Sequence, residues 1–229
     1  FPQGLVATAI SIAILPTLSR QVALARTSAA EGERDADYKN ILGLGLRLAI
    51  TLIIPAAIGL FVLSTPIVRL LFEHGEFTAV DTQITVDALR LYLIGLPFAA
   101  VDLLLVYAFY ARQDTLTPAL IGVVSLIVYM IVALALLPSI GLFSLMVADS
   151  VKHIVHAALS AVILSRRIDG YGAQRIPLTL IKTGIAAGLM GAVALLVEPV
   201  LEGVFAGGGT IREGLLVIAA GGLSMIVFF

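Results

Sequence analysis

Cysteine is absent from the 229-residue chain, and charged residues are scarce. The absence of cysteine excludes a disulfide framework and thiolate-ligated metal sites, although it indicates nothing about the redox compartment. Asp, Glu, Lys and Arg make up 13% of the residues, whereas they make up about a quarter of a soluble domain. Hydrophobic residues make up 60%, and the formal net charge is −1. The composition predicts a lipid-embedded protein and gives no indication of a nucleic-acid partner.

Sequence patterns typical of enzymes are also missing. The glycine-rich run GGGT at 207–210 lacks the lysine and the spacing of a phosphate-binding loop, and neither Gly-x-Ser-x-Gly nor His-Glu-x-x-His occurs. Glu73 and Glu76 are the only close carboxylate pair beside a predicted helix end, and we interpret them as a solvated turn. We therefore expect no enzymatic activity, no cofactor and no metal site.

Long apolar stretches fill most of the chain. A transmembrane helix needs roughly 20 mostly apolar residues, and seven stretches meet this requirement. They lie at about 3–25, 41–63, 79–110, 118–137, 142–165, 177–197 and from 211 onward. The sequence predicts an all-α integral membrane protein with seven transmembrane helices. Both ends of the chain look cut, so we interpret it as a fragment with a truncated last helix.

Proline, threonine and aspartate mark several predicted helix features. Pro16 and Pro55 lie inside apolar stretches and are expected to kink their helices. Thr78 and Asp81 have the spacing of a capping box, which satisfies the first free N–H groups of a helix. The uncharged segment 138–141 is expected to form a tight turn between the fourth and fifth helices.

Lysine and arginine in the short loops predict the orientation of the chain. The loops after the first, third and fifth helices carry most of these residues, whereas the opposite loops carry only Arg69 and Arg212. The basic residues of the first set are Arg20, Arg26, Arg34, Lys39, Arg112, Arg166, Arg167, Arg175 and Lys182. We expect the start of the chain on the outer side, so that segment 71–82 is external and segment 109–118 is cytoplasmic.

Arg47 is a candidate binding residue because it lies about two turns into the second predicted helix. An arginine at the centre of a membrane costs about 2.5–3.5 kcal/mol on insertion scales, and less near an end. One interpretation is an arginine that extends its head to the cytoplasmic headgroups. The other is a cation that faces a water-filled cavity and holds an anionic group such as a phosphate, which the planar donors of arginine fit well.

Ionisable residues also occur inside the third and fifth predicted helices. Asp102 lies near the middle of the third helix, where it must be protonated, paired or facing a cavity. Asp149, Lys152, His153 and His156 follow i, i+3, i+4, i+7 spacing, which places them on one helical face. Asp149 and Lys152 can neutralise one another in a structural stripe, or the four can line a hydrophilic cavity. A metal site is the least favoured interpretation.

Several short segments together resemble the C-terminal half of the MurJ (MviN) lipid II flippase family, in the multidrug/oligosaccharidyl-lipid/polysaccharide exporter superfamily. They are FPQG at 1–4, ILPTLSR at 14–20, GLR at 45–47, LFEHGEFTAVDT at 71–82 and FYARQDTLTP at 109–118. The resemblance covers residues 1–167 by motif and the remainder by helix number and length. No single segment is decisive, and the order and spacing carry the resemblance.

The resemblance implies a specific architecture. The seven helices resemble helices 8–14 of a fourteen-helix, two-lobed alternating-access transporter. Residues 1–167 would form most of the C-terminal lobe, with five transmembrane helices. Residues 168–229 would form the terminal helix pair, which borders a groove for the lipid tail.

The resemblance also implies a function. The protein would move undecaprenyl-diphosphate-linked disaccharide-pentapeptide, lipid II, from the cytoplasmic to the outer leaflet of the bacterial inner membrane. Arg47 would then belong to the cations of the central cavity. The expected partners are lipid II, membrane lipids and the missing N-terminal lobe.

The chain departs from the family pattern within the third helix, where Leu103 occupies a commonly basic position and Asp102 is unusual. The Asp149–His156 stripe also matches no family motif, so these residues are candidates for a cavity or coupling role. Two other hypotheses remain open at this point. One is an exporter of another polyprenyl-linked oligosaccharide or a drug/cation antiporter, and the other is a membrane scaffold that does not transport.

Overall fold

The computed structural model describes residues 8–25, 31–171, 174–204 and 210–228. Within these residues the chain forms eight α-helices and no strands. They are α1 (Thr8–Ala25), α2 (Glu31–Val62), α3 (Ser64–Phe72), α4 (Ala79–Ala111), α5 (Leu116–Ile140), α6 (Phe143–Arg167), α7 (Ile176–Val204) and α8 (Thr210–Phe228). The prediction of an all-α chain is confirmed.

Five of these helices are long and apolar enough to cross a membrane: α4, α5, α6 and parts of α2 (Ala36–Val62) and α7 (Ile176–Val197). In α8 the apolar segment found is shorter, Glu213–Ile226. The described part of α1 has 18 residues. A multi-pass membrane architecture is therefore confirmed, whereas the count of seven transmembrane helices stays a prediction.

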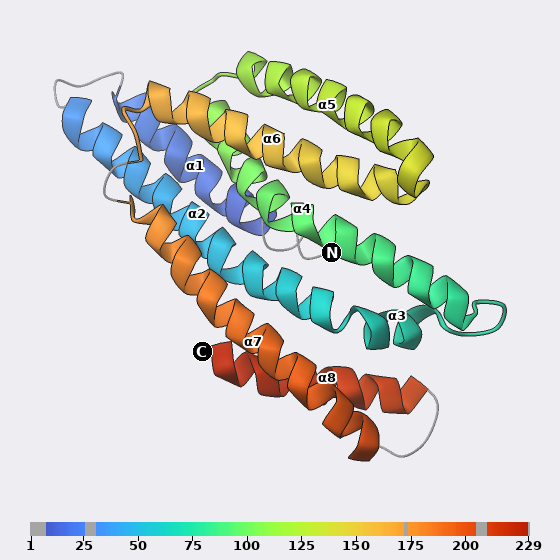
Figure 1. The fold of residues 1–229 in the computed structure, drawn as a ribbon. Coiled ribbons are helices and arrows are strands. Elements are labelled where there is room, and N and C mark those ends of the chain that lie inside the picture. Colours follow the sequence, from blue (N-terminus) through green and yellow to red (C-terminus); the bar gives the residue numbers. More distant parts are fainter. Residues whose placement is uncertain (1–7, 26–30, 172–173, 205–209, 229) are drawn as a thin grey trace.

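The helices lie side by side in a curved row, with α5 at one edge and α7 and α8 at the other (Figure 1). From α5 inward the packing order is α6, α4 and then α2, which contacts α7. Helix α1 packs against both α2 and α4. The largest buried cluster joins α2, α4 and α6 and includes Tyr38, Leu42, Leu105, Phe109 and Leu164. Helix α4 therefore lies at the centre of the fold, between α6 on one side and α1 and α2 on the other.

Helix α5 shows why the outer edge faces lipid. Its buried residues, Pro118, Ile121, Ser125 and Ala133, recur at helical spacing and face α6. Large apolar side chains such as Ile131, at 62% exposure, cover the rest of its surface. In water this would be an unfavourable surface, whereas in a bilayer it contacts acyl chains.

The capping box at the start of α4 is confirmed. The backbone N–H of Thr78 donates to Oδ2 of Asp81 at 2.8 Å, and the backbone N–H of Asp81 donates to Oγ1 of Thr78 at 3.5 Å. Pro16, Pro55 and Pro97 lie inside α1, α2 and α4, as predicted.

Several boundaries differ from the sequence prediction. Helix α2 begins at Glu31 and not near residue 41, and α7 extends to Val204 and not only to about residue 197. Pro138 lies inside α5, which continues to Ile140, so the expected turn at 138–141 is wrong and the chain reverses at Gly141, whose φ is +56°. The short helix α3 was also not predicted. Because Pro66 has no N–H to donate to the carbonyl of Val62, α2 ends there and a new helical segment begins at Ser64.

Candidate functional site

The polar residues predicted on α4 and α6 meet at one interface. Nδ1 of His156 on α6 lies 2.5 Å from Oδ1 of Asp102 on α4. The hydroxyl of Ser160, one turn further along α6, donates to the same Asp102 oxygen over 3.3 Å. The side chains of Asp102 and His156 are 13% and 15% exposed. The structure therefore shows that Asp102 is paired. Its partners lie on α6, and the sequence did not identify α6 as the helix that packs against this part of α4.

The remaining polar residues of α6 form a second group beside this pair. Lys152 Nζ forms an ion pair with Asp149, as the sequence indicated, and His153 Nε2 lies 3.5 Å from Asp149 Oδ2. Lys152 Nζ also lies 5.8 Å from the centre of the Tyr129 ring on α5, a cation–π geometry. The charge of Lys152 is thus held between a carboxylate and an aromatic face.

Sequence reasoning missed two members of this polar interface, Ser160 and Tyr129. Ser160 follows His156 by four residues, so helical periodicity could have placed it on the same face. Tyr129 could not be found in this way because it lies on another helix. Among the described residues no group of three or more His, Cys, Asp or Glu side chains has the arrangement of a metal site.

Helices α4 and α6 approach closely two turns away from the pair. The hydroxyl of Ser150 on α6 donates to the carbonyl of Leu91 on α4 at 2.7 Å. A Cβ placed on Gly95 would lie 2.6 Å from Cα of Ser150, a distance that backbone atoms do not tolerate. Gly95 is therefore required for the two helices to pack at this separation.

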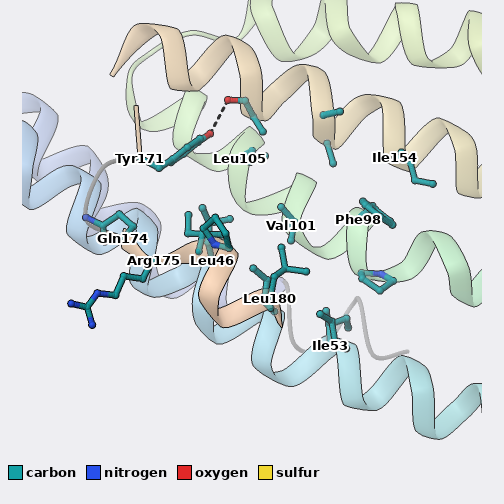
Figure 2. A pocket seen from close by; sticks show the side chains of 18 residues that line it. Leu46, Ile53, Phe98, Val101, Leu105, Ile154, Tyr171, Gln174, Arg175 and Leu180 are labelled. Carbon is teal, nitrogen blue, oxygen red and sulfur yellow. Dashed lines mark hydrogen bonds between the residues drawn. The ribbon is translucent and has the colours of Figure 1, made fainter. Parts of the chain in front are cut away.

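Other residues of α4 and α6 border an apolar cavity of about 570 Å³. Its walls come from α2, α4, α6 and the first turns of α7, as Figure 2 shows for Leu46, Val101, Ile154 and Leu180. The volume lies within the usual range of ligand pockets. The lining is almost entirely hydrocarbon, so the cavity suits an apolar group.

Polar side chains occur at one end of this cavity, in the segment between α6 and α7. Tyr171 donates from its hydroxyl to the carbonyl of Ala161 at 3.0 Å, and Gln174 donates from Nε2 to Oδ1 of Asn40 at 2.9 Å. Burial raises the pKa of the Tyr171 phenol, and Tyr38 adds to that shift. The phenol thus stays neutral and keeps its donor role. The guanidinium of Arg175 points away from the cavity (Figure 2).

Arg47 lies outside both features. Its side chain is half-buried on α2, and it forms no hydrogen bond or ion pair with a described residue. Its neighbour Leu46 lines the apolar cavity, whereas Arg47 does not. The structure therefore does not bring Arg47 together with Asp102 or with the Asp149–His156 stripe, and its binding role stays a prediction.

Comparisons with known proteins identify relatives along most of the chain. Residues 1–212 match the family described as lipid II flippase MurJ. A protein of Rhizobium meliloti named as a probable lipid II flippase MurJ is 34% identical over 193 residues, which cover 83% of this chain and 34% of the relative. A Haemophilus influenzae protein of the same name is 34% identical over 196 residues, covering 84% of this chain and 37% of the relative.

A solved structure has a similar fold. A lipid II flippase MurJ in an inward closed conformation aligns with a TM-score of 0.74 at 23% sequence identity, covering 99% of this chain and 43% of the other. This similarity concerns the arrangement of helices. The chain spans little more than a third of the length of the two curated relatives described above.

Proposed function

The chain belongs to the MurJ lipid II flippase family, and from that membership we propose that it forms the C-terminal part of a transporter for lipid II. In this proposal the polyprenyl-diphosphate-linked precursor crosses from the cytoplasmic to the outer leaflet of the bacterial inner membrane by alternating access. The family match over residues 1–212 carries the proposal. The complete transporter also needs an N-terminal lobe.

The apolar cavity supports a role in holding the lipid part of the substrate. A polyprenyl chain consists of hydrocarbon, and each buried methylene contributes about 0.8 kcal/mol of transfer free energy. The cavity is bordered by the first turns of α7, which belongs to the terminal helix pair at 168–229. We assign a segment of the polyprenyl chain to this cavity, with the polar end at Tyr171 and Gln174 nearest to the diphosphate.

Membrane orientation follows the distribution of basic residues. In the proposed orientation the start of the chain faces the outer side, and the segment between α6 and α7 faces the cytoplasm. The polar end of the cavity then lies at the cytoplasmic surface, where lipid II is available before transport. This arrangement agrees with loading of the substrate from the inner leaflet.

Arg47 is assigned to the anionic head of the substrate. A half-buried guanidinium without a carboxylate partner among the described residues has donors available for a phosphate oxygen. Arg47 lies on the same helix as the cavity residues Leu46 and Ile50. A substrate that binds along α2 would contact both groups.

Complementation of a flippase-depleted bacterial cell by the full-length gene tests this function. We expect the wild-type gene to restore growth and Arg47→Ala to abolish it while the protein is still made. Arg69→Ala is the matched control, because the Arg69 side chain is 40% exposed and pairs with Glu73 over 3.8 Å at the surface. Such a surface pair contributes about 0–1 kcal/mol, so the control should grow normally.

The two possible failures have different meanings. Normal growth of Arg47→Ala would exclude an essential role for that arginine and leave lipid II transport intact. Failure of the wild-type gene to restore growth, despite normal protein levels in the membrane, would contradict lipid II as the substrate.

A further inference from the structure

The His156–Asp102 pair is unusual because an imidazole and a carboxylate meet between two helices within the membrane-spanning region. Asp102 Oδ1 receives the Ser160 hydroxyl at 3.3 Å and contacts His156 Nδ1 at 2.5 Å. Ionisable groups inside a membrane are costly unless they are paired, and they commonly mark ion or proton pathways. Nothing in the lipid II chemistry described above requires this pair.

Hydrogen bonding determines where a proton can bind. When the Asp102 carboxylate is ionised it can only accept, and Nδ1 of His156 then carries the hydrogen of the contact. In the neutral imidazole this leaves Nε2 unprotonated. A Cβ placed on Gly122 of α5 would lie 3.8 Å from Nε2, so this atom faces the α5 backbone at a position without a side chain. Nε2 is therefore the proton acceptor of the pair.

We propose that His156, oriented by Asp102, is the proton-binding site through which the transporter couples proton movement to its conformational cycle. Before binding, the Asp102 carboxylate is ionised and the His156 imidazole is neutral. After binding, the carboxylate is still ionised and the imidazole has become an imidazolium, with the added proton on Nε2. The net charge of the pair thus changes from about −1 to about 0. The proposal rests on the transport function proposed above.

The neighbouring charges do not supply this neutralisation. On α6, Lys152 pairs with Asp149, and His153 also lies against Asp149, although it is close enough to Asp102 and His156 to interact with them electrostatically. Tyr129 of α5 faces Lys152. On the other helices that pack on α4, the described charged side chains are Arg20 of α1, Asp37, Lys39 and Arg47 of α2, and Arg69 of α3, and none of these pairs with Asp102 or His156. Among the described residues, His156 is the one basic side chain that forms an ion pair with Asp102.

The pair is placed where its charge affects movement. Helices α4 and α6 share an extended interface, and the Gly95–Ser150 contact lies on it. Moving an interface that carries a net negative charge through a low-dielectric environment is unfavourable, whereas moving a neutral ion pair costs less. Protonation would therefore lower the cost of moving α4 and α6 together when the lobe changes orientation in alternating access.

The test uses the full-length protein in vesicles of phosphatidylethanolamine and phosphatidylglycerol, with fluorescently labelled lipid II as the substrate. The measured quantity is the ratio of translocation rates with and without an imposed pH gradient of about two units. The proton concentration changes tenfold for each pH unit. For one coupled proton, a gradient of about two units therefore sets an upper bound of about 100-fold on this ratio. We expect a ratio of at least about fivefold for the wild type and a ratio near one for Asp102→Asn/His156→Gln.

His153→Gln is the matched control because it removes a neighbouring imidazole that does not contact Asp102. It should keep the wild-type ratio. If the double variant does not fold, His156→Gln alone replaces it, since its amide can still donate to Asp102 but does not bind a proton. A wild-type ratio near one, an unchanged ratio in the double variant, or loss of the ratio in His153→Gln would each overturn the assignment of His156, while translocation itself would still support lipid II transport.

A second measurement is independent of the substrate. Hydrogen exchange of α4 and α6 in the full-length protein, corrected for intrinsic rates, should change between pH 8 and pH 6 in the wild type and remain unchanged in the double variant. If lipid II is not translocated at all, this experiment still tests the site. Equal pH dependence in both proteins would overturn the proposal.

Discussion

Helices α4 and α6 border two regions with opposite chemistry. In one region Asp102, His156 and Ser160 form a polar interface, and in the other Val101, Leu105 and Ile154 line an apolar cavity of about 570 Å³. Asp102 and Val101 are adjacent in sequence, yet helical geometry directs them to different surroundings. A pair of helices can thus contact hydrocarbon and an ionisable pair at the same depth, because each face has its own partners.

This contrast indicates a division of roles. The apolar cavity can hold part of a lipid without any change in charge, whereas the polar interface can change charge without contacting the lipid. If this division is correct, substitutions on one face should leave the property of the other face unchanged.

Breaking the Asp102–His156 pair should have the largest effect on the free energy of unfolding. His156→Leu leaves Asp102 without its imidazole partner, and removal of one member of a buried pair costs about 3–5 kcal/mol. The side chains are 13% and 15% exposed, so we expect a value near the lower limit. Denaturant titration of the full-length protein in detergent micelles measures the free energy of unfolding.

The double substitution Asp102→Val/His156→Leu is the control for this prediction. It removes both partners of the pair, and replacement of a buried pair by apolar residues is often neutral or stabilising. A double variant as unstable as His156→Leu would show that the cost comes from packing and not from an unpaired charge.

Gly95→Ala should destabilise the same interface by about 1–3 kcal/mol, the usual cost of overpacking. The new Cβ would lie 2.6 Å from Cα of Ser150, so α4 and α6 must separate. Gly188→Ala on α7 is the matched control, because no atom lies within 4 Å of a Cβ there. The control should be slightly more stable, since alanine favours a helix by about 0.5–1 kcal/mol over glycine. Equal midpoints for the two variants would contradict the close α4–α6 packing.

Ala158→Phe should fill part of the cavity with little change in the free energy of unfolding, because Ala158 lines open space. If the cavity holds the lipid chain, displacement of about two methylenes removes about 1.6 kcal/mol of transfer free energy, or about tenfold in rate. Ala135→Phe on the exposed surface of α5 is the control and should translocate lipid II normally. Normal rates for Ala158→Phe would exclude the cavity as the lipid site.

A surface ion pair between the ends of α4 and α6 gives the smallest expected effect. Burial opposes ionisation of Asp114, but hydrogen bonds from Thr117 and the charge of Arg167 outweigh it and lower the Asp114 pKa to about 2. Because the pKa is lowered, the stabilisation is complete above the ordinary pKa of 3.8 and is lost as the pH falls toward about 2. Arg167 is 43% exposed, so the contribution should stay below about 1 kcal/mol.

Asp114→Asn checks this contribution. The unfolding midpoint of the variant should be slightly lower than that of the wild type at pH 7, and the difference should vanish near pH 2. A difference that persists at pH 2 would show that Asp114 stabilises the protein by packing and not by its charge.

Much of this fold could be predicted because the signals are local. Apolar length gives the helices, the Thr78–Asp81 spacing gives the start of α4, and the i, i+3 spacing gives the Asp149–Lys152 pair. The contact between Asp102 and His156 could not be predicted in this way. These residues are 54 positions apart, and periodicity identifies the face of a helix but not the helix that packs against it.

The apolar cavity and α3 were missed for related reasons. A cavity depends on how four helices pack, and every residue that lines it also fits an ordinary membrane-facing or core position. Helix α3 depends on where Pro66 interrupts the hydrogen bonds of α2, and a continuous apolar run conceals this interruption. Arg47 illustrates another case, since the sequence predicted its place on a transmembrane helix while its binding role stays a prediction.

The most direct test of the division between the two faces is lipid II translocation by full-length protein in vesicles, measured with and without a pH gradient for two variants in parallel. We predict that Ala158→Phe lowers the rate about tenfold under both conditions and keeps the wild-type gradient ratio. We also predict that Asp102→Asn/His156→Gln reduces that ratio to about one. A wild-type rate in Ala158→Phe, or a wild-type ratio in the double variant, would contradict the division.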